Sequence, residues 1–282
     1  MTHEGRSVVE AVAVFSAIAS VQYLVPGVAQ LARWETRALG ESYFRGLLTV
    51  AVPLIALLAS KASLEDYGLV PDWRTSLGRG LTGYLYLVPP NLAVYFLSII
   101  WAGVTDPFVS LFVSGVTLLT MFLALNRLSR GGRPRPRGAL VVVAVLLGAP
   151  LVLSLLFGSF SLRLVSAVFW DLVFGGFAGE LLYRGYVQGR VNEEYGRPWR
   201  FMSVAFGPGL LVSSVLYGVA GAMSWLRPVR DVYALSLPVG VHGLALGLFL
   251  GFLREASGDV GAGSVASGVS GAVGRLLTGV FR

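Results

Sequence analysis

The chain has 282 residues and a formal net charge of +7, and hydrophobic residues make up 55% of it while charged residues make up only 13%. Its mean hydropathy is +0.73, and a soluble domain carries about 25% charged residues. The composition therefore excludes an ordinary soluble protein and indicates an integral membrane protein. Cysteine is absent, which excludes disulfides, a thiolate nucleophile and cysteine metal ligands. The basic residues mostly flank apolar runs, as topology and lipid headgroups require, so no nucleic-acid binding is expected.

Apolar runs that are long enough to cross a bilayer follow one another along the chain. The first half contains runs at about 8–31, 44–60, 82–103, 107–126 and 138–158, and the second half at about 163–190, 201–226, 232–253 and 260–281. The last run is the least apolar, although its small residues would let buried helices approach closely. We therefore expect an all-α, polytopic transmembrane bundle of about eight or nine spans.

Basic residues concentrate between the fourth and fifth runs, in NRLSRGGRPRPRG, which contains Arg127, Arg130, Arg133, Arg135 and Arg137. The positive-inside rule places this loop in the cytoplasm. Alternating sides from there predicts a multi-pass protein of the cell membrane with a cytoplasmic N-terminus. The first run lacks a small-residue cleavage site followed by a polar sequence, so we expect it to be retained and not cleaved as a signal peptide. The loop that contains Arg190, Arg197 and Arg200 is then also cytoplasmic.

Two opposite charges interrupt the sixth run, in GELLYRGYVQGR at residues 179–190. Glu180 and Arg184 are four residues apart, so on a helix they share a face and can pair. Charges within a span are costly and usually face a bundle interior or a wet cavity. The spacing alone allows either a structural ion pair or a functional site, near the cytoplasmic end of the span.

The string GELLYRG resembles the EExxxRG motif of the CPBP family, which comprises the CAAX prenyl endoproteases and bacteriocin-processing-like membrane proteins. In that family the motif ends a long transmembrane helix, and later helices carry Phe-x-x-x-His and His-x-x-x-Asn patterns. Here SSVLYGVAG at 213–221 and SVASGVSGA at 264–272 follow in the expected order, with a glycine-rich helix between them. The resemblance implies a CAAX-protease-like four-helix core at 163–282, with residues 1–158 forming an N-terminal set of transmembrane helices.

The family's intramembrane endopeptidases are thought to use glutamate and histidines to activate water, and this chain departs from that pattern. Glu180 and Arg184 are retained, whereas the positions of the first glutamate, the two histidines and the asparagine are occupied by Gly179, Gly221, Ser267 and Gly271. Amide hydrolysis needs a base and fixed donors or a metal for the developing oxyanion. The missing groups therefore predict that hydrolytic chemistry has been lost.

Histidine is scarce, since the chain has only His3 and His242. A catalytic zinc ordinarily takes three protein ligands, so neither a metal nor another cofactor is expected. His242 precedes a run in which glycine recurs every fourth residue from Gly243, which predicts a close-packing face about 100° away from the histidine. We favour an interior hydrogen-bonding histidine, with a relocated catalytic role as the alternative. Asp171, earlier on the motif helix, is expected on roughly the opposite side from Glu180.

Three functions are left open. The first is a degenerate protease fold that lies in membrane lipid and binds a hydrophobic or prenylated peptide, or another membrane protein. The second is an active endopeptidase that uses Glu180 and Arg184, with His242 or Asp171 as the partner. The third is a transporter or structural subunit in which the motif is coincidental. The sequence GVSG at 268–271 fits the serine motif of rhomboid proteases, but no histidine base follows it.

Overall fold

A computed structural model describes residues 5–129, 136–224, 228–229, 232–233 and 235–280, and shows an all-α bundle with two short hairpins. The helices are α1 Arg6–Leu24, α2 Pro26–Leu39, α3 Tyr43–Ala59, α4 Trp73–Ile100, α5 Pro107–Ser129, α6 Pro136–Leu156, α7 Leu162–Trp170, the π-helical η1 Asp171–Ala178 and η2 Leu181–Val187, α8 Gln188–Tyr195, α9 Pro208–Ser224, α10 Leu237–Ser257 and α11 Gly261–Val280. The strands are β1 Trp199–Phe201, β2 Val204–Phe206, β3 Pro228–Val229 and β4 Val232–Tyr233. His3 and much of the arginine-rich loop, including Arg130, Arg133 and Arg135, lie outside the described residues.

The length and composition of the helices confirm an integral membrane protein. Among the described residues, 5 helices are long and apolar enough to cross a bilayer, and α3, most of α6 and α9 are shorter apolar helices. Large apolar side chains stay exposed along α5 and α6, among them Leu111, Leu119, Val141 and Leu155. Exposed apolar surface of this extent is unusual in soluble monomers and suits contact with lipid tails.

Two of the expected spans differ in the structure. The run at 8–31 is broken at Pro26, because Val25 before it adopts an extended conformation and α2 restarts at the proline. The run expected at 201–226 is helical only from Pro208, since residues 199–206 form the antiparallel β1–β2 hairpin. By contrast, the glycine-rich run at 260–281 forms the regular helix α11 over Gly261–Val280.

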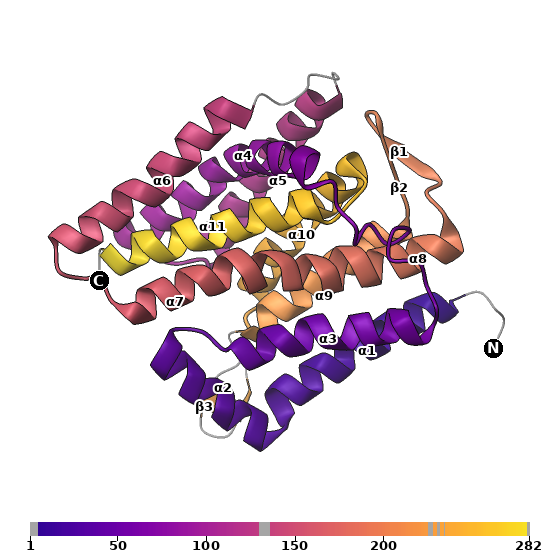
Figure 1. Ribbon diagram of the computed structural model, residues 1–282, viewed down its shortest axis with the longest axis horizontal. Coiled ribbons are helices and arrows are strands. Elements are labelled where there is room, and N and C mark those ends of the chain that lie inside the picture. Colours follow the sequence, from indigo (N-terminus) through magenta and orange to yellow (C-terminus); the bar gives the residue numbers. More distant parts are fainter. Residues whose placement is uncertain (1–4, 130–135, 225–227, 230–231, 234, 281–282) are drawn as a thin grey trace.

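One continuous helix of 34 residues, Leu162–Tyr195, crosses the molecule as α7, η1, η2 and α8. We call it the motif helix because it carries Glu180 and Arg184. Figure 1 shows α1, α2 and α3 on one side of it, and α11 with α4, α5, α6 and α10 on the other. The main core cluster combines α4 side chains such as Leu81 and Tyr84 with Leu250 of α10 and Ala266 of α11. The division between residues 1–158 and 163–282 stays a prediction, and packing continues across it.

The start of α1 and the α3–α4 loop meet the motif helix at its α8 end (Figure 1). The backbone N–H of Gly5 donates to the Glu194 carboxylate at 2.7 Å, which places a negative charge at the start of α1. Tyr67 of the loop donates its hydroxyl proton to Glu193. Burial, with the Glu193 carboxylate beside it, raises the pKa of Tyr67 to about 12, so the phenol remains a donor at physiological pH.

Candidate functional site

The motif helix changes its hydrogen-bonding pattern around the GELLYRG sequence. Asp171–Ala178 and Leu181–Val187 are π-helical, and Glu180 lies between these two segments. A π-helix has more residues per turn than the 3.6 of an α-helix, and π turns often occur at functional sites. Glu180 lies close to the middle of the 34-residue helix and not near its end as expected, because the helix continues to Tyr195.

Glu180 and Arg184 form a buried ion pair, with Arg184 Nε 3.9 Å from Glu180 Oε2 and the two side chains 0% and 1% exposed. Arg184 Nη2 also donates to the Gly247 carbonyl of α10 at 3.0 Å. Its guanidinium carbon lies 5.0 Å from the centre of the Tyr217 ring of α9, a cation–π contact. Arg184 therefore joins three helices of the core.

Several atoms of this pair lack hydrogen bonds. In the described part of the chain, Glu180 Oε2, Arg184 Nε and Arg184 Nη1 are buried without a hydrogen-bond partner. A buried polar atom without a partner costs free energy and is uncommon in folded proteins. The two charges of the pair thus compensate each other, but the pairing leaves some of the buried nitrogen and oxygen atoms without hydrogen bonds.

Helix α11 covers the carboxylate of Glu180 through a glycine. A Cβ atom added to Gly263 would lie 2.2 Å from Glu180 Oε2 and 2.8 Å from its Cδ. The glutamate side chain therefore rests directly on the α11 backbone, and no larger residue fits there without movement. Gly263 lies one helical turn before Ser267, the position to which the sequence assigned the last family motif.

Ser267 and Gly271, the two α11 residues assigned to the last family motif, contact the motif helix at positions further along it from Glu180. Ser267 Oγ donates to the Gly263 carbonyl at 2.8 Å, and the Gly176 carbonyl of η1 lies 3.4 Å from it. A Cβ on Gly271 would lie 3.2 Å from the Cβ of Asp171. Sequence reasoning missed Gly263, although the small residues at 263, 267 and 271 recur every fourth position and could have indicated one continuous face.

Asp171 does not lie opposite Glu180 as expected, because both residues face α11. The π-helical turns between them widen the helix, so two residues that an α-helix would separate return to one side. Arg275 Nε donates to Asp171 Oδ2 at 2.9 Å, and the same guanidinium pairs with Glu41 before α3. Asp171 is thereby held in an ion network between α11 and the N-terminal helices.

The second family motif maps to α9, where Tyr217 and Gly221 face different neighbours. The Tyr217 ring packs edge-on against the Tyr183 ring of the motif helix at 4.9 Å between centroids. An added Cβ on Gly221 would lie 3.4 Å from the Val239 carbonyl of α10. Tyr217 therefore contacts the motif helix, whereas the position that is histidine in the family lies against α10.

His242 is half-buried on α10, and its Nδ1 is buried without a hydrogen-bond partner among the described residues. The hydrogen bond expected for an interior histidine is thus not present at Nδ1. The predicted close-packing face is confirmed, because added Cβ atoms at Gly243 and Gly247 would meet Gly218 and Ser214 of α9 at 3.1 and 3.0 Å. Neither His242 Nδ1 nor Glu180 Oε2 has a hydrogen-bond partner, so these two atoms are not bonded to each other.

A cavity opens beside Gly179, the position of the first glutamate of the family motif. It has a volume of ≈ 270 Å³, and it is walled by the motif helix, α1, α2 and α3. A Cβ on Gly179 would meet nothing within 4 Å. Gln22, Arg45 and Thr49 contribute polar groups to its wall, and Gln22 and Thr49 also line a smaller apolar cavity of ≈ 60 Å³.

The residues that the structure describes do not form a catalytic metal site. No group of three His, Asp or Glu side chains among the described residues is placed to hold an ion. The one histidine that the structure describes, His242, is not hydrogen-bonded to Glu180 through Nδ1. Three protein ligands are the usual minimum for catalytic zinc.

Residues 161–270 match a protein family described as type II CAAX prenyl endopeptidase Rce1-like. No curated protein and no solved structure gives a significant match to the chain. The matched range confirms the resemblance read from GELLYRG, begins at the start of the motif helix and ends one residue before Gly271. It includes both Gly263 and Ser267.

Proposed function

We propose, from the premise that this chain is a membrane protein of the CPBP family with a CAAX-protease-like core, that it binds a hydrophobic or lipidated peptide, or a membrane partner, without hydrolysing it. The observation that carries the proposal is the closure of Glu180 against Gly263, where its carboxylate is 1% exposed and paired with Arg184. A general base must reach the water that it activates, and this carboxylate is enclosed by helix packing.

The loss of the family's polar groups supports the same proposal. Gly221, Ser267 and Gly271 offer no imidazole or amide side chain to Glu180 or to a developing oxyanion. Family resemblance alone does not carry the reaction, because a fold can be kept while its chemistry is lost. The protein would then use the fold for recognition.

The cavity beside Gly179 supports binding. It lies where the motif's first glutamate would project, and replacement by glycine leaves that space open to a ligand. Polar groups of Gln22, Arg45 and Thr49 stand at this cavity, and apolar side chains such as Phe15 and Leu182 line its smaller neighbour. Trp170 and Phe174 add apolar surface to the larger cavity itself, and a wall with polar and apolar parts suits an amphipathic segment.

The test combines cleavage and binding on the purified protein in lipid nanodiscs. Transmembrane and prenylated peptides are offered to the wild type and to Glu180→Gln, and products are identified by mass spectrometry. We expect no cleavage by either protein. Cleavage by the wild type that disappears in Glu180→Gln would establish an active endopeptidase instead.

Binding is measured with the same peptides carrying a fluorophore. Gly179→Leu fills the cavity and is expected to weaken binding at least about tenfold, equivalent to about 1.4 kcal/mol. Gly274→Leu is the matched control, because Gly274 is exposed on α11 and an added Cβ meets nothing within 4 Å. Equal binding by the wild type and both variants would remove this cavity from the proposal.

We also propose the orientation that the charge distribution indicates, in the cell membrane with a cytoplasmic N-terminus. The contacts of Gly5 and Tyr67 with Glu194 and Glu193 support it, since they gather segments that alternation assigns to one side. The density of basic residues assigns this end of the bundle to the cytoplasm.

A further inference from the structure

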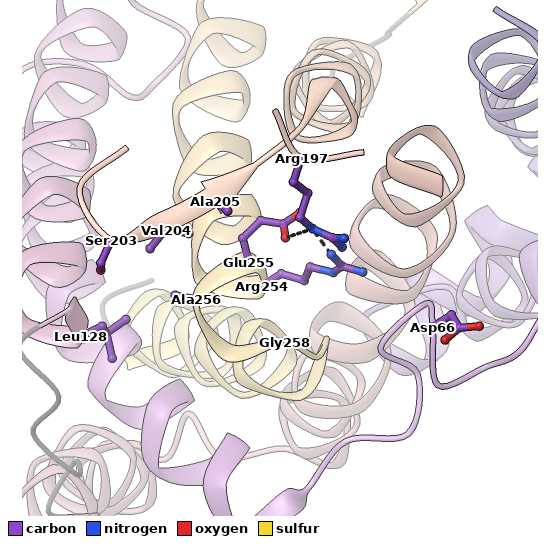
Figure 2. Close-up of a pocket in the computed structure, with 10 residues that line it drawn as sticks. All are labelled: Asp66, Leu128, Arg197, Ser203, Val204, Ala205, Arg254, Glu255, Ala256 and Gly258. Atoms are coloured by element: carbon purple, nitrogen blue, oxygen red, sulfur yellow. Dashed lines mark hydrogen bonds and ion pairs between the residues drawn. The ribbon is translucent and has the colours of Figure 1, made fainter. Parts of the chain in front are cut away.

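A third cavity, of ≈ 330 Å³, lies at the α8 end of the molecule, away from Glu180. Figure 2 shows it between the end of α10, the β1–β2 hairpin and the end of α5. Charged side chains from three segments line it, namely Arg197 before the hairpin, Arg254 and Glu255 on α10, and Asp66 of the α3–α4 loop. Asp66 is separated from the other three, which form one cluster in Figure 2.

The carboxylate of Glu255 is already saturated by donors from the protein. Arg197 Nε donates to its Oε2 at 2.7 Å, and Arg254 Nη1 donates to its Oε1 at 3.1 Å. Gln188 and Asn192 donate to the same Oε1 at 2.7 and 2.9 Å. One carboxylate therefore serves two guanidinium groups, so the cluster of Arg197, Arg254 and Glu255 keeps one positive charge, while Asp66 adds a negative charge to another part of the cavity wall.

Arg254 has unused binding capacity. The residue is 2% exposed, and its Nε is buried without a hydrogen-bond partner in the described part of the chain. A buried cation is expensive unless it is paired and its donors are satisfied. A guanidinium matches the oxygens of a phosphate in a two-pronged geometry, and a second anion in the cavity would offset the positive charge of Arg254.

The end of α10 does not oppose an anion in the way that a bare helix C-terminus would. The Arg254 carbonyl accepts from the Gly258 backbone N–H at 2.8 Å, and the Ser257 carbonyl accepts from Arg79 Nη1 at 2.8 Å. These terminal carbonyls are therefore engaged, and Arg79 adds a further positive charge near this end.

We propose that this cavity binds a phosphate group, carried either by an anionic lipid headgroup or by a small soluble phosphate compound. The residues that would hold it are Arg197 and Arg254, whereas Ser203 of the hairpin turn lines the other side of the cavity in Figure 2. The site is independent of the binding proposed beside Gly179, since the two cavities share no lining residue.

The experiment measures stabilisation by two phosphate sources. In one arm, inorganic phosphate is titrated onto the full chain in nanodiscs of neutral phosphatidylcholine. In the other, the nanodiscs contain increasing phosphatidylglycerol, and bound lipid is counted by native mass spectrometry. A rise in unfolding temperature with phosphate assigns a soluble ligand, and specific retention of the anionic lipid assigns a headgroup.

Three variants make the result specific. Arg197→Gln removes a half-exposed donor and is expected to weaken binding about tenfold, because a charge-assisted hydrogen bond is lost. Glu255→Gln removes the competing negative charge and is expected to tighten binding, a gain that misfolding would not produce. Arg200→Gln, exposed on β1 and outside the cavity lining, is the matched control and should bind as the wild type does.

Two outcomes would overturn the proposal. One is the absence of stabilisation in both arms for the wild type. The other is equal weakening by Arg197→Gln and Arg200→Gln, which would show general attraction to a basic surface and no defined site.

Discussion

At the scale of single residues, the Glu180–Arg184 pair shows how two charges can be buried in a hydrophobic helix. Neither side chain reaches solvent, and each lowers the cost of burying the other. Tyr217 and the Gly247 carbonyl give Arg184 further partners, whereas Glu180 rests on the Gly263 backbone. This arrangement makes Arg184 the residue that links helices and Glu180 its counter-charge.

Removing one member of the pair should therefore cost much more than removing both. Arg184→Met leaves Glu180 buried without its counter-charge and is expected to lower the free energy of unfolding by about 3–5 kcal/mol. The double variant Glu180→Leu with Arg184→Met should recover most of that loss. The measurement is unfolding in mixed micelles with increasing sodium dodecyl sulfate.

Arg163→Met provides the control, because Arg163 is exposed on the same helix. It should change the free energy of unfolding by about 0.5 kcal/mol or less. If the double variant lost the sum of the losses measured for Arg184→Met and for Glu180→Leu alone, the two charges would not be coupled and the ion pair would contribute nothing to stability.

At the scale of helices, the contact between the motif helix and α11 depends on small residues. Gly176 of η1 would place an added Cβ 2.5 Å from the Ser264 carbonyl, and Gly80 of α4 would place one 2.7 Å from the Ala262 carbonyl. Helix α11 is thus pressed closely between two others. In a membrane, where lipid tails are as apolar as the helix surfaces, such close packing is a main source of association.

Gly263→Ala tests this packing where it meets the site. The new methyl group would collide with the Glu180 carboxylate, and overpacking of this kind is expected to destabilise the protein by about 1–3 kcal/mol. Gly274→Ala on the same helix should be neutral or stabilising by up to about 1 kcal/mol, since alanine favours helix and the space is open. Equal effects of the two substitutions on the unfolding free energy would argue against close contact at Gly263.

The sequence predicted helix positions well where apolar runs are long, and less well where local geometry decides. Composition cannot reveal that π turns bring Asp171 and Glu180 to one face of the motif helix, because both α- and π-helices tolerate the same residues. The family motif located Glu180 and Arg184 correctly on one helix. It did not identify Gly263, since the register of two packed helices depends on side-chain volumes and not on motif spacing.

At the scale of the whole molecule, the alternation of helices agrees with contacts at one end. Gly5 and the loop containing Tyr67 both bind the α8 end of the motif helix, and Arg79 at the start of α4 binds the end of α10. The charge rule assigns all these segments to the cytoplasm. The segments that the charge rule assigns to one side of the membrane therefore lie at one end of the bundle, as a polytopic protein requires.

Cysteine labelling tests this orientation with little background, because the chain has no native cysteine. Glu65→Cys lies in the exposed α3–α4 loop, and Thr105→Cys lies in the exposed connection between α4 and α5. In intact cells, a membrane-impermeant maleimide should label the cysteine at 105 and leave the one at 65 unmodified until the membrane is opened. The reverse pattern would place the N-terminus outside, since Gly5 and Tyr67 share one end of the bundle. Labelling of both cysteines in intact cells would mean that α4 does not span the membrane, because the two sites flank that helix.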